Sequence, residues 1–125
     1  MILLLDAHTL LWALVDDGTL RRDARDAIAD PANDVLVSAA TVWELAIKRQ
    51  LGKLDAPADL GAAVIALKFI GLPITLADGE SAASLPRHHG DPFDRMLVAQ
   101  ARRLGAVVVT RNPTFALYGV DVLPA

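Results

Sequence analysis

The start of the chain places an acid at the end of a buried strand. Four apolar residues, Ile2–Leu5, precede Asp6, and apolar residues at helical spacing follow over 9–15. An apolar run without polar alternation is typical of a strand that is buried on both faces. A carboxylate directly after such a strand lies at its carboxyl end. In an open parallel sheet, ligands bind at that edge.

Strand and helix patterns alternate along the rest of the chain. Further strands are expected at 34–37, 72–76, 106–109 and 120–123, and helices at 9–15, 20–29, 40–51, 60–70, 80–85 and 92–104. This alternation predicts an α/β fold, with a central, mainly parallel sheet flanked by helices on both faces. No linker, repeat or low-complexity segment interrupts the pattern, so residues 1–125 are expected to form one domain.

Composition limits the class of protein. The absence of cysteine excludes a disulfide framework and a thiolate metal site. No apolar stretch approaches the ~18 residues that span a bilayer, and no basic segment precedes the first apolar run, so we expect a cytoplasmic protein. The hydrophobic fraction of 54% is above the ~45–50% of ordinary domains, which predicts association with itself or with a partner. An alanine-rich genome-wide composition would explain the surplus equally well.

Polar side chains gather at one edge of the predicted sheet. Parallel strands share one direction, so the groups that follow them meet there: Asp6, Ser38, Glu44, Asp94, Thr110, Arg111 and Asn112. The same edge is expected to carry Asp91, as the N-cap of the helix that begins at Pro92. The convergence predicts a functional site.

Each acid also has a purely structural interpretation. Asp6 and Asp91 suit helix caps, Asp94 complements a helix dipole, and Glu44 is spaced for an ion pair with Lys48 worth ~0.3–0.5 kcal/mol. Taken together, however, carboxylates at one edge repel each other by up to ~4 kcal/mol per close pair. A cation relieves this repulsion, and oxygen-only ligands select Mg²⁺ or Mn²⁺. Such ions suit phosphodiester hydrolysis.

Four segments in order resemble the PIN-domain ribonucleases, specifically the VapC-type toxins of toxin–antitoxin pairs. They are LLLDAHTLLW at 3–12, VSAATVWELAIK at 37–48, HGDPFDRMLVAQA at 89–101, and VVTRN at 108–112 followed by FALYG at 115–119. The resemblance implies a Mg²⁺- or Mn²⁺-dependent endoribonuclease that cleaves RNA, forms a homodimer and is neutralised by a VapB-like antitoxin.

The resemblance also assigns roles to individual residues. Asp6, Glu44 and Asp94 would be the catalytic, metal-binding acids, with Asp91 positioning Asp94. The family usually has aspartate where this chain has Asn112, which lowers the charge of the site by one and disfavours a second metal ion. The remaining assignments are supporting hydroxyls on Ser38 and Thr9, for which helix capping is an equal alternative, and weak contacts to the RNA backbone from Lys48, Arg95 and Arg111.

Other polar and aromatic residues are expected to be structural. His88 and His89 lie in a polar loop and are predicted to be solvated. Trp12 and Trp43 lie on apolar helix faces and are expected in the core or in an interface rather than as base-stacking platforms.

Two other functions compete with the ribonuclease. A phosphoacceptor receiver domain is also a compact α/β unit with acids at strand ends, but it needs paired acids after the first strand, and here Ala7 follows Asp6. A degenerate, non-catalytic domain that binds RNA or a protein partner is favoured by Asn112.

Overall fold

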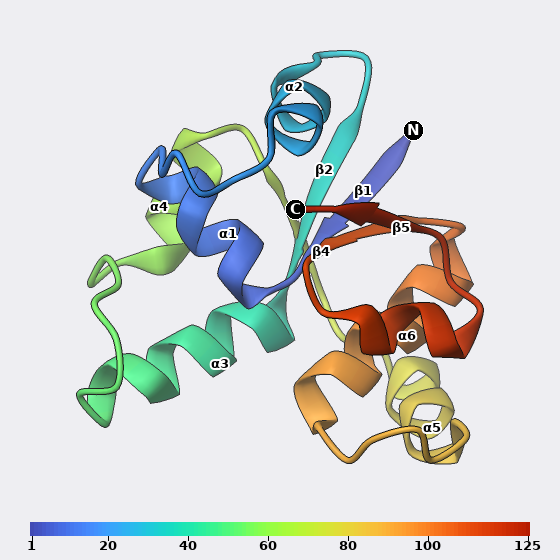
Figure 1. Ribbon diagram of the computed structural model, residues 1–125. Coiled ribbons are helices and arrows are strands. Elements are labelled where there is room, and N and C mark those ends of the chain that lie inside the picture. Colours follow the sequence, from blue (N-terminus) through green and yellow to red (C-terminus); the bar gives the residue numbers. More distant parts are fainter.

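A computed structural model describes all 125 residues and contains one parallel sheet (Figure 1). Its strands are β1 (Ile2–Leu5), β2 (Asp34–Ser38), β3 (Ile70–Leu72), β4 (Val107–Thr110) and β5 (Val122–Pro124). They are ordered β3-β2-β1-β4-β5, and every neighbouring pair is parallel. This sheet, with helices on both faces, confirms the α/β fold class.

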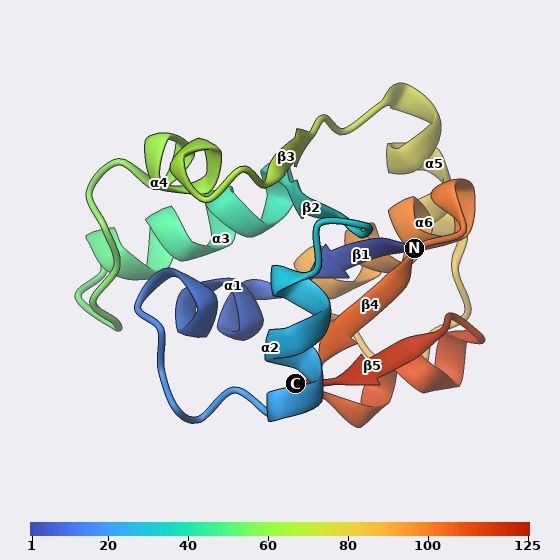
Figure 2. The same cartoon turned by 90° about the horizontal axis from the view of Figure 1, so that it is seen from above.

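The helices form two layers. They are α1 (Ala7–Leu14), α2 (Arg22–Ala29), α3 (Ala39–Gln50), α4 (Leu60–Ala66), α5 (Leu76–Ser84), α6 (Pro92–Leu104) and the short 3-10 helix η1 (Pro113–Tyr118). Helices α1 to α4 cover one side of the sheet, and α5, α6 and η1 cover the other (Figures 1 and 2). None of these helices is both long enough and apolar enough to cross a membrane.

Alternation along β1 explains why its sequence is continuously apolar. Leu3 and Leu5 pack into the core below α1 to α4, whereas Leu4 packs into the core below α6, and all are fully buried. Because successive strand side chains point to opposite faces, a strand between two helical layers needs apolar residues at every position. The buried central strand expected from the sequence is therefore confirmed.

The segment 60–85 differs from the expectation. The helix expected over 60–70 ends at Ala66, and the strand expected over 72–76 is β3, which begins at Ile70 because that residue pairs with Leu36 of β2. The helix expected from residue 80 begins at Leu76, where Thr75 and Asp78 form a reciprocal capping box. Strand pairing and this cap decided boundaries that apolar spacing alone left wrong.

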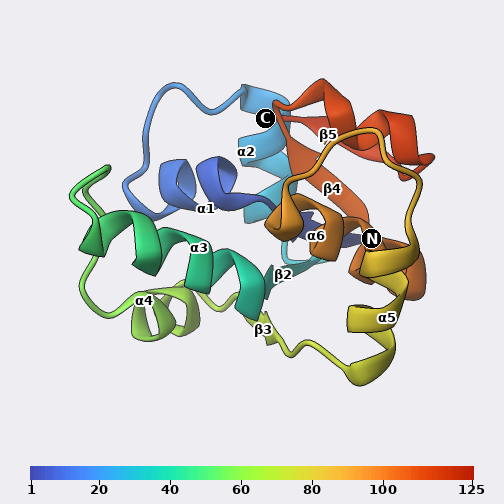
Figure 3. The same ribbon diagram turned by 90° about the horizontal axis from the view of Figure 1, so that it is seen from below.

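The carboxyl edge of the sheet is where three helices begin. Helix α1 follows β1 directly, α3 follows β2 directly, and α6 packs against both α3 and β1. Seen from below (Figure 3), the first turns of α1, α3 and α6 gather around the end of β1. Side chains from these three helices therefore meet at a single place.

Candidate active site at the carboxyl edge of the sheet

Asp6 is held rigidly where β1 passes into α1. Asp6 is 7% exposed. Oδ1 accepts a hydrogen bond from the backbone N–H of Thr9 at 3.0 Å, so Asp6 is the N-cap of α1. Oδ2 accepts a short hydrogen bond from the hydroxyl of Thr110, the last residue of β4. The carboxylate thus caps a helix and also joins two strand ends.

Glu44 projects from the second turn of α3 and is nearly as buried as Asp6. Its Oε2 accepts a hydrogen bond from Lys48 Nζ at 2.7 Å, one turn further along the helix. The i,i+4 ion pair that the spacing allowed is therefore present. Lys48 therefore places a positive charge beside the acids.

Asp94 lies in the first turn of α6, whose N-cap is Asp91. Asp91 Oδ1 accepts hydrogen bonds from the backbone N–H groups of Phe93 at 2.9 Å and Asp94 at 3.1 Å. Asp91 is therefore the N-cap of α6, as the sequence predicted. Two side chains approach Asp94 Oδ2 at 3.4 Å, namely His89 through Nε2 and Asn112 through Nδ2.

The pKa of Asp94 responds both to its burial and to the other acids at this edge of the sheet. Burial raises the pKa of Asp94 from its ordinary value of 3.8 to about 6. The carboxylates of Asp91, Glu44 and Asp6 contribute to this rise in pKa. Like charges within one low-dielectric region disfavour the ionised form, so the carboxyl edge concentrates negative charge as the sequence predicted.

An aromatic pair holds two of the acid-bearing helices together. Trp43 of α3 and Phe93 of α6 pack edge to face, with ring centroids 5.4 Å apart at an interplanar angle of 75°. Each ring belongs to the residue immediately before an acid, Glu44 or Asp94. Such pairs are worth ~0.5–1.5 kcal/mol beyond their buried area. Trp43 is nevertheless 62% exposed, so it is not a core residue.

The donor set fits a hard divalent cation in its chemistry. Carboxylate and amide oxygens from Asp6, Glu44, Asp94 and Asn112 are the ligand types that Mg²⁺ and Mn²⁺ prefer. The side chains are not arranged as a metal centre, because no group of three or more acidic or histidine side chains is positioned to hold an ion. Each carboxylate is instead engaged by a protein donor: Thr110, Lys48 or His89.

The predicted supporting groups behave differently from one another. The Ser38 hydroxyl accepts from the N–H of Ala40 at 3.1 Å and caps α3. The Thr9 hydroxyl donates to the carbonyl of Val109 at 2.9 Å, and only its backbone N–H touches Asp6. The Ser38 hydroxyl therefore follows the capping alternative, whereas the Thr9 hydroxyl neither caps a helix nor contacts an acid. Asn112 does reach Asp94 through Nδ2, while its Oδ1 caps η1 by accepting from Thr114 N.

One of the three basic residues expected to steer RNA was assigned wrongly. Arg95 is 7% exposed. Its guanidinium donates at 3.0 Å or less to the carbonyls of Ala82, Leu85 and Pro86, which anchors the segment before α6. A buried guanidinium saturated by carbonyls is unavailable to a phosphate. Sequence reasoning erred here because an arginine in a polar first turn resembles a solvated one.

The other two basic residues remain accessible. Lys48 lies beside Glu44 at the site. Arg111 is exposed, donates to the carbonyls of Thr19 and Ala125, and stacks over the Trp12 ring at 4.4 Å. Arg111 therefore joins chain segments around β4, with part of its surface open to solvent.

Sequence reasoning gave no role to three residues that touch the acids or their partners. Thr110 was placed at the right edge but not paired with Asp6. His89 was expected to be solvated, yet its side chain is 21% exposed and contacts both Asp94 and Tyr118. The expectation holds for its exposed neighbour His88. A threonine ending a buried strand was the available signal for Thr110, whereas nothing local marked His89 or Tyr118.

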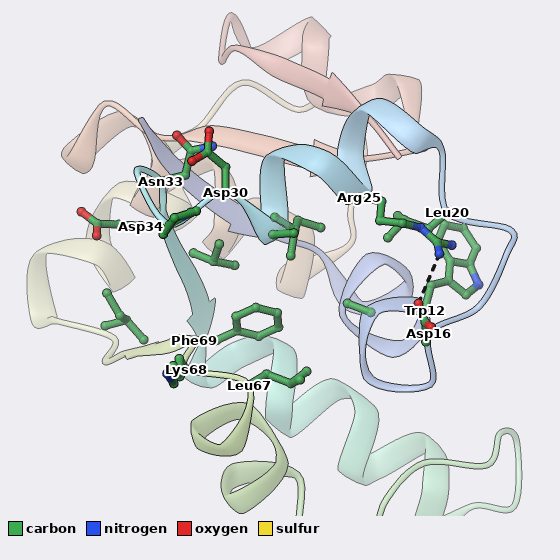
Figure 4. Close-up of a pocket in the computed structure, with 16 residues that line it drawn as sticks. Trp12, Asp16, Leu20, Arg25, Asp30, Asn33, Asp34, Leu67, Lys68 and Phe69 are labelled. Atoms are coloured by element: carbon green, nitrogen blue, oxygen red, sulfur yellow. Dashed lines mark hydrogen bonds and ion pairs between the residues drawn. The ribbon is translucent and has the colours of Figure 1, made fainter.

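A separate hollow of about 520 Å³ lies away from the acids (Figure 4). It opens between α1, α2 and the start of β3, with Trp12 and Phe69 among its walls. Arg25 and Asp16, 3.2 Å apart, form an ion pair at its rim. This hollow contains none of Asp6, Glu44 or Asp94, so it is separate from the candidate site.

Comparison with known proteins supports the fold. A family model described as PIN domain matches residues 3–120. No curated protein sequence matches the chain. The structure is similar to that of VapBC2 from Rickettsia felis bound to a promoter DNA fragment, with a TM-score of 0.73 and 14% identity over 99% of this chain and 98% of that chain.

Two further solved structures agree. DNA-bound VapBC from Salmonella typhimurium gives a TM-score of 0.72 and 19% identity over 99% of this chain and 98% of that chain. A toxin–antitoxin complex from Klebsiella pneumoniae gives a TM-score of 0.60 and 23% identity over 96% of this chain and 94% of that chain. At these identities the similarities establish a shared fold.

Proposed function

This chain belongs to the PIN domain family, and from that premise we propose that it is a divalent-metal-dependent endoribonuclease of the VapC toxin type. The observation that carries the proposal is the placement of three acids around the carboxyl end of β1: Asp6 at the β1–α1 junction, Glu44 in α3 and Asp94 in the first turn of α6. The charges of Glu44 and Asp6 help to raise the pKa of Asp94. A cluster of carboxylates that is costly without a cation suits binding of Mg²⁺ or Mn²⁺.

We assign the cation to Asp6, Glu44 and Asp94, with Asn112 beside them. A bound Mg²⁺ or Mn²⁺ supplies Lewis-acid activation of water and neutralises charge at the phosphoryl group. Thr110 and the N-terminus of α1 hold the carboxylate of Asp6 in one orientation. If Glu44 held the cation, its ion pair with Lys48 would open, and the Lys48 ammonium would be free to bind an RNA phosphate.

Cleavage of RNA by purified protein tests the proposal. A structured RNA is incubated in Mg²⁺, Mn²⁺ or EDTA with wild type, Asp6→Asn, Asp94→Asn and the exposed control Asp55→Asn. Loss of one metal ligand is expected to reduce the rate by about 100-fold or more, since even outer-shell partners are worth about 10–100-fold. Cleavage by Asp6→Asn and Asp94→Asn at the wild-type rate would remove the metal mechanism.

A second candidate function is a non-catalytic domain that binds RNA or a protein partner. Three features favour it: the neutral Asn112, the Lys48–Glu44 ion pair, and the absence of a group of three side chains positioned for a metal ion. Calorimetric titration with Mn²⁺ separates the two functions. Saturable binding that disappears in Asp6→Asn supports the nuclease, and no binding by wild type supports the non-catalytic domain.

We further propose that the protein acts in the cytoplasm as a homodimer neutralised by a VapB-like antitoxin. Large apolar side chains at the surface support association: Trp43, Ile65 and Leu76 are 62%, 66% and 93% exposed. An apolar groove of about 710 Å³ between α3, α4 and β3 adjoins Trp43 and Ile65. Light scattering of the purified protein tests the dimer. Co-purification with the product of the adjacent reading frame, with loss of cleavage, tests the antitoxin.

A further inference from the structure

A chain of hydrogen bonds leads from the protein interior to Asp94. Arg95 Nη1 donates to the Tyr118 hydroxyl oxygen at 3.3 Å. That hydroxyl lies 2.7 Å from Nδ1 of His89, and Nε2 of the same imidazole lies 3.4 Å from Asp94 Oδ2. Tyr118 is 2% exposed, so its hydroxyl is shielded from solvent. The four residues form one connected polar path.

The donors and acceptors along this hydrogen-bonded chain have one favourable arrangement. The Arg95 guanidinium only donates, so the Tyr118 oxygen accepts from it, and the hydroxyl hydrogen is free to point at His89. Nδ1 of a neutral His89 then accepts, which leaves the ring proton on Nε2, opposite Asp94. The reverse tautomer would leave the hydroxyl hydrogen without a partner and set a bare ring nitrogen against a carboxylate.

We propose that His89 is a positioning residue for Asp94, held by Tyr118 as the Nε2–H tautomer so that it binds Oδ2 and presents Oδ1 to a ligand. The inference deepens the proposed function, because Asp94 is one of the acids assigned to the metal. Asn112 Nδ2 approaches the same oxygen at 3.4 Å. Both contacts use Oδ2, so Oδ1 would be the oxygen available to a cation. Partners of this kind orient metal ligands and are typically worth 10–100-fold in affinity.

Packing keeps the imidazole in place. The His89 ring lies against the Tyr118 ring with centroids 5.5 Å apart. The backbone carbonyl of His89 lies 3.5 Å from Arg95 Nη1. Neighbouring His88 packs edge-on against the same tyrosine at 4.8 Å but is exposed and makes no contact with Asp94. His88 is therefore a matched control: the same residue type, on the same loop, against the same ring.

The first test reads the tautomer in the metal-free protein. Long-range nitrogen–proton NMR correlation spectra of the imidazoles, recorded in mildly alkaline buffer, are expected to show His89 protonated at Nε2. Tyr118→Phe removes the hydroxyl and is expected to give a mixture of both tautomers at His89. Asp94→Ala is expected to shift the Nε2–H resonance of His89 and leave His88 unchanged. A predominant Nδ1–H tautomer in wild type would overturn the inference.

The second test measures Mn²⁺ affinity by calorimetry. His89→Ala is expected to weaken binding by about 10–100-fold. His89→Gln, which keeps an N–H donor near the position of Nε2, is expected to recover most of the affinity, and His88→Ala to bind like wild type. A merely structural role would make the alanine and glutamine variants equal. Thermal unfolding of each variant confirms that it is folded.

The outcomes keep the two proposals apart. Mn²⁺ binding by wild type with unchanged affinity in folded His89→Ala overturns the positioning role and leaves the nuclease proposal standing. Failure of wild type to bind Mn²⁺ overturns the proposed function instead. The imidazole spectra, which need no metal, then still decide whether His89 is held on Asp94 in the direction described.

Discussion

The side-chain amide of Asn112 lies 3.4 Å from Asp94 Oδ2, so a neutral donor stands beside the most perturbed acid of the site. A carboxylate at position 112 would meet Asp94 as a like charge. The amide instead donates to it, while its own oxygen caps η1. Asn112 therefore lowers the repulsion among the acids and lowers their demand for a cation.

Replacement of Asn112 by Asp is expected to exchange stability for metal affinity. The cap of η1 is retained, but the new charge destabilises the metal-free protein by about 1 kcal/mol and strengthens Mn²⁺ binding by about tenfold, because affinity grows with ligand charge. Urea unfolding in EDTA and Mn²⁺ calorimetry measure both effects. Asn112→Ala, which adds no charge, should not bind more tightly; equal affinity in Asn112→Asp and wild type would contradict this account.

Lys48→Met is expected to affect metal and RNA in opposite directions. In this variant Glu44 has no ion pair that must break before it binds a cation, so Mn²⁺ is expected to bind more tightly. RNA binding weakens, and the slope of log affinity against log salt falls by about 1, as for loss of one phosphate contact. Lys53→Met, an exposed lysine distant from the acids, is the control. A variant whose salt slope equals that of wild type would show that Lys48 makes no phosphate contact.

The raised pKa of Asp94 predicts that the metal-free protein loses stability as pH rises. The folded protein holds the Asp94 proton up to about pH 6, whereas the unfolded chain releases it near 3.8. The folded state therefore binds more protons between these values, and the stability from protonated Asp94 is present below pH 3.8 and lost as pH rises through about 6. In EDTA at alkaline pH, Asp94→Asn should be more stable than wild type by about 2 kcal/mol.

Urea unfolding at several pH values checks this dependence. The difference between Asp94→Asn and wild type should shrink toward zero as the acid becomes protonated, and Asp55→Asn should show no such trend. Saturating Mn²⁺ should restore the stability of wild type but not of Asp94→Asn, because only the charged acid gains from the cation. An advantage of Asp94→Asn that is the same at pH 4 and pH 8 would point to another cause.

Arg95→Lys is expected to destabilise the fold although it keeps the charge. The guanidinium serves the carbonyls of Ala82, Leu85 and Pro86 together, and an ammonium cannot reproduce this fork. Loss of buried bonds to a charged donor predicts a decrease of about 2–4 kcal/mol in the free energy of unfolding. Chemical denaturation measures it, with exposed Arg87→Lys as the control. Unfolding of Arg95→Lys at the same urea concentration as wild type would contradict the stabilising role of the Arg95 guanidinium.

The sequence was sufficient wherever structure depends on neighbouring residues. Continuous apolar character predicted the central strand Ile2–Leu5, and the cap residues Ser38 and Asp91 marked the starts of α3 and α6. It misplaced β3, expected over 72–76 but found at Ile70–Leu72, because residues 70 and 71 pair with β2 rather than extending the helix before them. Hydrogen bonds to a distant strand are not visible in local spacing.

The sequence by itself determined which edge of the sheet carries the acids, because parallel strands bring their carboxyl ends together whatever lies between them. Only the tertiary structure decided what each acid touches. Thr110 reaches Asp6 across 104 positions of sequence, and Tyr118 reaches His89 across 29. Such contacts depend on how helices pack over the sheet and on which rotamers that packing allows, and this information is not periodic along the chain.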